Sequence, residues 1–197
     1  MKVSREQAAE NRERILSVAA RLFRERGIDG VSLNDIMKAA GLTHGGFYGH
    51  FKSKEDLVAQ ASALAISNRR QAWMRTVEEA NGNPFKALSS AYLTKQHRAH
   101  FGQGCPFAAL GGELARQTPS VRHAASEELG HFIDSLSRVA PGRTGSARRK
   151  QAISAYASMI GALIMSRVVD DADFSDEILE SVSQTFAAAG EASSSAN

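Results

Sequence analysis

Residues 32–57, SLNDIMKAAGLTHGGFYGHFKSKEDL, decide the fold that this sequence predicts. Ser32 is followed three residues later by an acid, which is the pattern of a capped helix start, and Gly41 ends that helix after about two turns. A second short segment, 44–50, follows, with Thr43 as its predicted N-cap. Two short helices joined by a glycine-containing turn are the parts of a helix-turn-helix motif.

The second short segment has one apolar side and one polar side. Phe47 and Phe51 are four residues apart, so they share a face and are expected to pack inward. Tyr48 can donate a hydrogen bond to a phosphate, and Thr43 and Ser32 stand at helix N-termini, where backbone N–H groups also favour phosphate. The structural alternative for Tyr48 is a half-buried ring whose hydroxyl has a partner elsewhere in the fold. The residues on the polar side are His44, Gly45, Tyr48, Gly49 and His50.

Longer helices flank this unit on both sides. Apolar residues at helical spacing predict an amphipathic helix over 5–26, and Ser53 followed by two acids predicts a long helix that ends near residue 80. No stretch alternates with a period of two, so we expect an all-α fold of about nine helices and no sheet. The further helices are expected over 84–100, 107–115, 120–139, 147–169 and 175–188.

Composition narrows the class of protein. The 197 residues are 43% hydrophobic and 23% charged, which is typical of a globular protein. The longest nearly apolar run, 152–165, is shorter than the ~18 residues of a membrane span, and the first 14 residues are too charged for a secretory signal, so we expect a cytoplasmic protein. One cysteine, Cys105, excludes an internal disulfide and a cysteine-based zinc site.

Charge is distributed unevenly along the chain. The net charge is +3 over residues 1–53, +6 over 54–150 and −6 over 151–197. A basic front suits a polyanion such as DNA, and the acidic end argues against an anionic membrane. Solvated helix faces of unequal charge would explain the same counts.

Residues 41–57, together with Phe23, Gly27 and the segment 31–36, resemble the N-terminal domain of the TetR family of transcriptional regulators, over about residues 9–60. The resemblance implies an all-helical homodimer with a helix-turn-helix domain over 1–55. A bundle over 56–190 would bind an effector and dimerise, and 191–197 would be a frayed tail. The resemblance and the helix faces together give these candidate DNA-binding residues: Ser32, Thr43, His44, Gly45, Tyr48, His50 and Lys54.

Glycines make this segment unusual for the family. Gly45, Gly46 and Gly49 stand where many members have bulkier polar residues, and each glycine costs ~1 kcal/mol against alanine in a helix. Few side chains are left for base edges, and we expect the segment to order fully on DNA.

The run 102–114, GQGCPFAALGGEL, resembles a subgroup of TetR-like regulators with a Gly-Cys-Pro turn, some of which sense electrophiles or oxidants through cysteine. Cys105 is therefore a candidate effector site, favoured by the helix predicted to follow it, and the alternative is an inert buried thiol. His97 and His100 near Cys105 formally resemble a metal set, but solvated histidines are the expectation, with no metal and no cofactor.

Two sets of apolar residues suggest further sites. A small-molecule pocket between helices could be lined by aromatic and methionine side chains, which at helical spacing are more often core. These pocket candidates are Trp73, Tyr92, Phe101, Phe107, Phe132 and Met159. The last two helices carry more apolar surface than we expect one subunit to bury, which favours a two-fold symmetric four-helix interface. These interface candidates are Tyr156, Ile160, Leu163, Ile164, Ile178, Leu179 and Val182.

The sequence thus predicts a homodimeric regulator, a repressor that binds a palindromic double-stranded DNA operator. A small molecule or a reactive electrophile would release it. A non-covalent sensor with a structural Cys105 is the alternative. An enzyme is not expected, because the known catalytic motifs are absent from the sequence, although Cys105 with His97 or His131 would suit a hydrolase. A helical scaffold or membrane-surface protein is the remaining rival.

Overall fold

The computed structural model describes residues 4–194, with side chains through residue 186. Within these residues the chain is helical and has no strand, as predicted. The elements in order are α1 (Arg5–Arg26), α2 (Leu33–Ala39), the 3₁₀ helix η1 (His44–Gly49), α3 (Lys54–Glu78), α4 (Pro84–Tyr92), α5 (Lys95–Ala99), the 3₁₀ helix η2 (Phe101–Gln103), α6 (Pro106–Leu114), α7 (Pro119–Ser137), α8 (Gly145–Val168) and α9 (Ala172–Ser194).

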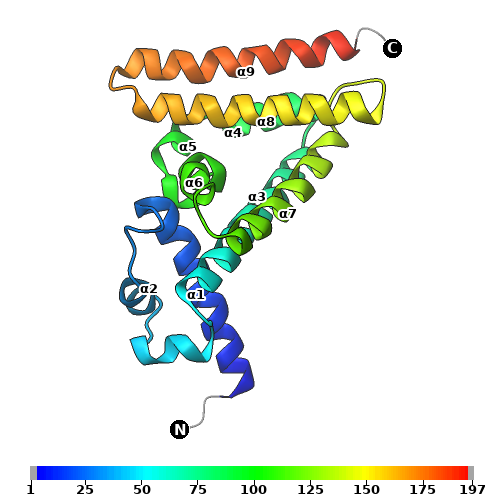
Figure 1. The fold of residues 1–197 in the computed structure, drawn as a ribbon. Helices are drawn as coiled ribbons and strands as arrows, with labels where there is room; N and C mark the ends of the chain where they lie inside the picture. Colours follow the sequence, from blue (N-terminus) through cyan, green and yellow to red (C-terminus); the bar gives the residue numbers. More distant parts are fainter. Residues whose placement is uncertain (1–3, 195–197) are drawn as a thin grey trace.

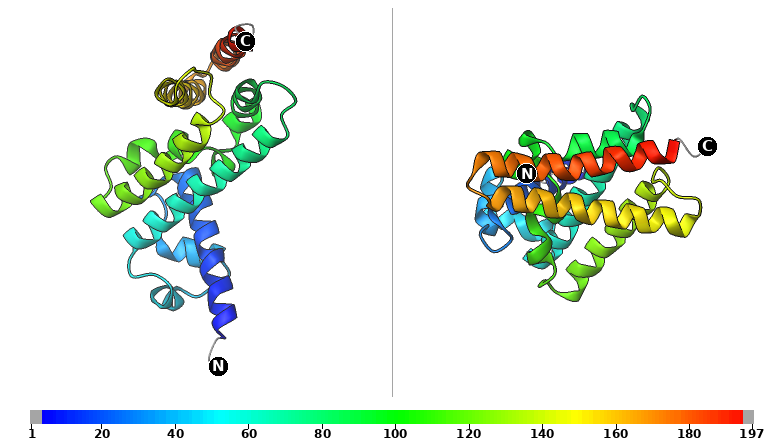
Figure 2. Two further views of the ribbon diagram at one scale, coloured as in Figure 1. Left: turned by 90° about the vertical axis from the view of Figure 1, so that its right-hand side faces the viewer. Right: turned by 90° about the horizontal axis from the view of Figure 1, so that it is seen from above.

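The helices form an elongated molecule with two different ends. One end is formed by α1, α2 and η1, and at the other end α8 and α9 run side by side (Figure 1). The long helices α3 and α7 pack against each other and run diagonally between the two ends. The left view of Figure 2 shows the same separation of the two ends from the side. In the described part of the chain, no helix is both long and apolar enough to cross a membrane.

Two clusters of buried side chains hold the fold together. The first joins α1, α2 and η1 to α3, α6 and α7, and includes Phe23, Phe47 and Leu114. The second lies among α3, α4 and α6 to α9 and is centred on aromatic side chains. Phe107 packs against both clusters. The predicted boundary at residue 55 therefore runs through a shared core, because residues from both sides of it fill the first cluster.

The predicted helix over 84–100 is wrong, because the chain breaks at Leu93 into α4 and α5. Leu93 has φ −87° and ψ 66°, which is not helical. The side chain of Thr94 then accepts a hydrogen bond from the backbone N–H of His97 and starts α5. At the break, the carbonyl of Tyr92 accepts a hydrogen bond from the His97 ring and so still has a partner.

Two other predicted bounds differ from the structure. The second segment of the helix-turn-helix is a 3₁₀ helix, and Thr43 makes no capping hydrogen bond to it, which agrees with the low helix propensity of its three glycines. Helix α9 begins at Ala172, because the Asp171 side chain accepts from the N–H of Phe174 at 2.7 Å. It continues to Ser194, so residues 191–194 of the predicted tail are helical, and 195–197 lie outside the described residues.

Candidate nucleic-acid interface

Capping residues set the two helices on either side of the turn. The Ser32 hydroxyl accepts from the N–H of Asp35 at 3.1 Å, and the Asp35 carboxylate accepts from the N–H of Ser32, which completes the predicted capping box. Hydrogen bonds from Ser32 hold the pKa of Asp35 below its usual value. Ser32 also donates its hydroxyl proton to the Asp35 carboxylate. In this arrangement the hydroxyl has no proton left to donate to a phosphate.

The segment η1 turns one aromatic ring inward and one outward. Phe47 is fully buried and stacks on Phe51 with 5.6 Å between ring centroids. Tyr48 is 67% exposed and touches Phe47 edge to face at 5.1 Å. The half-buried alternative for Tyr48 is therefore wrong, and the exposed ring belongs to η1, which packs against α2.

The rest of this face is open. Thr43, His44 and Gly45 are exposed, and His50 is partly buried. A Cβ added at Gly45 would meet nothing within 4 Å, and the same holds at Gly49. Packing therefore does not require these two glycines, and their effect is to leave the backbone of η1 accessible to a large partner. By contrast, Gly41 in the preceding turn has φ 71°, which favours glycine.

Lys54 opens the helix that follows. Ser53 caps α3 by accepting from the N–H of Asp56 at 3.1 Å, and Lys54 is the first helical residue, partly buried. The Asp56 carboxylate accepts from the N–H of Lys52, and this bond lowers its pKa. The N-terminus of α3, with the cationic Lys54, thus follows η1 after a short connection. Arg12 of α1, which the sequence did not single out, lies over the Phe51 ring at 5.1 Å and completes this edge.

The lone cysteine lies in the other half of the molecule and is completely buried. Cys105 is 0% exposed, and its Sγ is 3.2 Å from the hydroxyl of Tyr156. Its backbone N–H donates to Nε2 of His97 at 2.9 Å, and Nδ1 of His97 donates to the Tyr92 carbonyl at 2.7 Å. Burial, followed by the charge of Arg69, lowers the pKa of His97 to about 4.

The expectation that His97 is solvated is therefore wrong, whereas His100 is exposed. Both ring nitrogens of His97 are used by the backbone, which leaves none for a metal ion or for the Cys105 thiol. The hydrolase pair of Cys105 and His97 is accordingly not formed, and His131 lies exposed beside Glu128. Across the described residues, no group of three or more His, Cys, Asp or Glu side chains could hold a metal ion.

The predicted pocket residues mostly fill the space between the helices themselves. Trp73 packs on Tyr92 and Phe132 at centroid distances of 5.4 and 4.8 Å, and Met159 is buried in the same cluster. They are core residues, which corrects the pocket assignment. Phe101 is 42% exposed, and the guanidinium carbon of Arg167 lies over one face of its ring, 4.0 Å from the centroid. Phe107 lines a hollow of about 520 Å³ between α6 and α7.

The predicted interface residues divide into two groups. Tyr156, Leu163, Ile178 and Leu179 are buried within the subunit, so assigning them to an outer face is wrong. Ile160 and Val182 are partly buried and Ile164 is exposed. Other exposed apolar side chains on α8 and α9 were not predicted, because helical spacing alone does not distinguish an inner from an outer face. They are Ile153, Met165, Val168 at 79% exposure and Phe174 at 51%.

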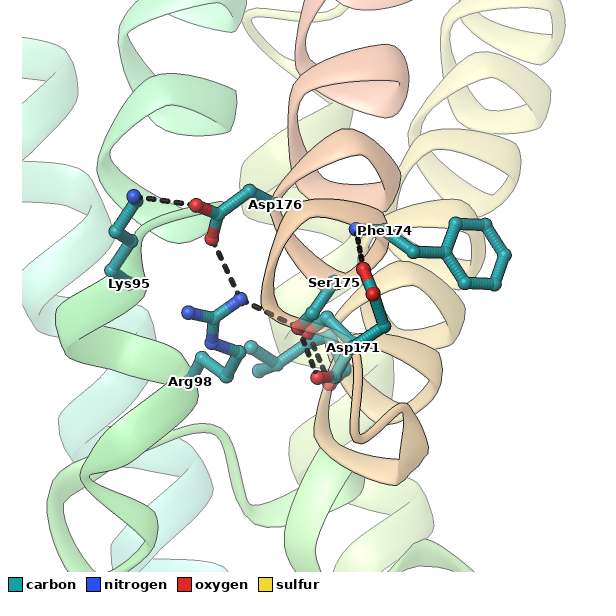
Figure 3. Close-up of polar contacts among 8 residues, drawn as sticks. Lys95, Arg98, Asp171, Phe174, Ser175 and Asp176 are labelled. Carbon is teal, nitrogen blue, oxygen red and sulfur yellow. Dashed lines mark hydrogen bonds and ion pairs between the residues drawn. The ribbon is translucent and has the colours of Figure 1, made fainter.

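A polar network fixes α5 against the start of α9. Asp176 accepts from Lys95 at 2.5 Å and from Arg98 at 2.8 Å, and these hydrogen bonds lower its pKa. Arg98 also donates to the hydroxyl of Ser175, and Figure 3 shows Phe174 pointing away from this network. The exposed ring of Phe174 therefore belongs to the outer surface of the α8–α9 layer.

Known proteins resemble this chain in sequence, most strongly at its N-terminal end. Residues 15–61 match the model of the family of bacterial regulatory proteins named tetR. The transcriptional regulator AcrR of Shigella flexneri is 39% identical over 85 residues, which is 43% of this chain and 40% of AcrR. The transcriptional repressor DhaR of Mycobacterium sp. strain GP1 is 26% identical over 175 residues, 85% of this chain and 88% of DhaR. The chain thus aligns with less than half of AcrR and with most of DhaR.

Solved structures share the whole fold. A TetR-family regulator from Cytophaga hutchinsonii has a TM-score of 0.75 at 23% identity, over 95% of this chain and 98% of its own. The reduced form of Escherichia coli NemR has a TM-score of 0.73 at 22% identity, over 88% of this chain and 95% of its own. Over residues 15–61 the chain thus matches the tetR family of bacterial regulatory proteins, and the described chain shares the fold of solved TetR-family regulators.

Proposed function

We propose that this protein is a DNA-binding repressor of transcription that acts as a homodimer on a palindromic operator and is released by a small effector molecule. The observation that carries the proposal is the exposed face of η1. Tyr48, His44 and Gly45 are exposed there, while the aromatic side chains of Phe47 and Phe51 are buried beneath them. Residues held this way can enter a major groove without unfolding the core. The relative DhaR is a transcriptional repressor by name, which supports repression as the sign of control.

Each candidate residue has a role that fits its position. Tyr48 and Lys54 would donate to phosphates on either side of the groove, and the exposed Thr43 hydroxyl would do the same at the start of η1. His44 and His50 are the side chains that can reach base edges. At Gly45 the missing side chain would let the backbone approach the DNA closely.

A second copy of the chain would complete the DNA-binding unit. The exposed apolar side chains of α8 and α9, among them Met165, Val168 and Phe174, would pair with the same surface of the partner about a two-fold axis. The two η1 segments would then meet DNA about 34 Å apart or at a multiple of that distance, which gives the palindromic site.

Two kinds of effector suit the core around Cys105. An electrophile or oxidant would modify the thiol, and a non-covalent ligand would act with Cys105 as a structural residue. The burial of Cys105 favours the non-covalent effector, because thiol reactions require access to sulfur. A covalent effector would first require local opening of the structure around the sulfur.

The test is selection of binding sites from random duplex DNA, followed by fluorescence anisotropy with the selected duplex at stated salt. Tyr48→Ala and His44→Ala should each weaken binding about fivefold to a hundredfold, since a good contact to DNA is worth about 1–3 kcal/mol. His123→Ala, an exposed position on α7, is the matched control and should bind as wild type does. Failure to select any duplex, or full binding by both η1 variants, would refute the proposal.

The same assay separates the two effector hypotheses. An electrophile such as N-ethylmaleimide is added to the complex of DNA with wild type and with Cys105→Ser. Release of wild type alone would establish the covalent switch. Retention of DNA by both proteins would leave the non-covalent effector.

A further inference from the structure

Arg69 on α3 carries a positive charge that the protein does not pair. Within the described residues its guanidinium makes no hydrogen bond and no ion pair, and its Nε is buried without a partner. The guanidinium carbon lies over the Tyr92 ring, 5.5 Å from the centroid, which holds the group in place. A buried N–H without an acceptor is unfavourable. The Nε of Arg70 is also buried without a partner, but only Arg69 also lines hollows in the surface, and this combination points to a ligand.

Arg69 lies between two hollows in the surface. One has a volume of about 170 Å³ and opens toward α4, α5 and η2, and the other has a volume of about 160 Å³ and opens toward α1 and α3. Arg69, Gln103 and Gly104 line both, so the hollows adjoin at the guanidinium. Each can hold a group of only a few heavy atoms, since drug-sized pockets begin at about 300 Å³.

The linings suit an anion with a short hydrocarbon part. Among the residues described, no aspartate or glutamate lines either hollow, and Arg24 adds a second cation to the one near α1. Burial lowers the pKa of Arg24 to about 10, so it stays charged at neutral pH. The same hollow also has apolar walls from Leu64, Ala65 and Ala72.

We propose that Arg69 binds the carboxylate of a small organic acid, with the hydrocarbon part against α3 and α1. The planar guanidinium of Arg69 matches a carboxylate through two parallel hydrogen bonds. The amide of Gln103 lies at the mouth of both hollows, where it can donate to the second carboxylate oxygen. A tetrahedral oxyanion would leave the apolar wall unused.

The site would connect the effector half to the DNA-binding half. Arg24 donates from Nε to the carbonyl of Gly102 at 2.9 Å, so η2 is attached to α1 beside the hollow. An acid seated at Arg69 would touch α1, α3 and the residues next to Gly102 at once. The binding claim itself does not depend on the proposed function, and it is tested without DNA.

The test is isothermal titration of the full chain with sodium butyrate and sodium benzoate, at ionic strength kept constant with chloride. Butyramide and benzamide serve as uncharged analogues, and inorganic phosphate as the competing anion. Arg69→Gln should weaken carboxylate binding about tenfold to a hundredfold, the range for a hydrogen bond to a charged group. Arg70→Gln is the matched control, because Arg70 is the next residue of α3, is also partly buried and lines neither hollow.

A second variant guards against misfolding at Arg69. Gln103 is exposed, so Gln103→Glu leaves the core intact and places a carboxylate at the mouth of the site, where it should abolish binding. Saturable binding of a carboxylate by wild type and Arg70→Gln, lost in both other variants, would confirm the site. Absence of binding by wild type, equal binding of the amides, tighter binding of phosphate, or unchanged binding in Arg69→Gln would each overturn the assignment.

Discussion

Acid should destabilise this protein through one buried histidine. The His97 ring donates to the Tyr92 carbonyl and accepts from the N–H of Cys105, so its folded form needs one proton on Nδ1 and none on Nε2. Protonation of Nε2 would make it a donor that faces the N–H of Cys105, which is also a donor, and would place a positive charge in a buried position near Arg69. Burial therefore lowers the pKa of His97 from 6.5 to about 4.

The sign and size of the effect follow from that shift. Between pH 6.5 and about 4 the unfolded chain binds a proton at this position and the folded chain does not, so the free energy of unfolding falls as the pH falls. The stabilisation is complete above pH 6.5. Lowering the pH from 7.5 to 4.5 should remove about 2.5 kcal/mol, a large share of the 5–15 kcal/mol that usually holds a domain folded.

Urea unfolding followed by circular dichroism at several pH values between 7.5 and 4.5 measures this loss, at one fixed protein concentration. In His97→Gln the side-chain oxygen can still accept from the N–H of Cys105, but nothing titrates. The variant should be less stable than wild type at pH 7.5, and the difference should shrink by about 2.5 kcal/mol at pH 4.5. The exposed His123→Gln should follow wild type. Parallel stability curves for wild type and His97→Gln would refute this account of the buried ring.

Three further predictions follow from other features. Cys105 should react with an aromatic disulfide reagent at least about a hundredfold more slowly in the native protein than in urea, because it is 0% exposed and must await local opening, and rapid native labelling would contradict its burial. Ser53→Ala should lower the free energy of unfolding by about 1 kcal/mol, measured by urea titration, whereas Ser53→Asp should keep the cap, and equal losses in the two variants would argue against the hydrogen bond to Asp56. Met165→Glu combined with Val168→Glu should convert the proposed dimer to monomer in analytical ultracentrifugation while the helix content stays unchanged, and an unaltered dimer would place the interface elsewhere.

The helix-turn-helix could be predicted because its signals are local. Ser32 and Ser53 cap helices through residues three positions away, and Phe47 and Phe51 share a face by spacing alone. The glycines of the second segment indicated a weak helix, and the structure has a 3₁₀ helix there.

The environment of Cys105 could not be predicted in this way. His97 is buried because it connects two backbone segments, the carbonyl of Tyr92 and the N–H of Cys105, and no periodic pattern marks such a bridge. The same contacts break the helix expected over 84–100. A polar histidine beside Arg98 in a short helix has the sequence context of a solvated residue.

Arg69 shows the same limit. It adjoins Arg70 on α3, and nothing in the sequence separates the two, yet one lines two hollows and the other lines neither. The difference comes from Gln103 and Gly104, which lie more than thirty positions further along the chain and pack beside Arg69. Only the tertiary fold brings that loop to this helix.

The contacts at the end of α1 limit how this protein can be recombined with its relatives. The N–H of Ile28 donates to the Glu113 carboxylate at 2.6 Å, and Leu110, Leu114 and Val121 fill the core under α1. A hybrid made by joining residues 1–55 to the C-terminal part of a related protein would lose these partners unless its own α6 and α7 supplied them. Under the proposed function, DNA specificity should therefore change through replacement of surface residues of η1, whereas exchange of the whole N-terminal segment should destabilise the fold.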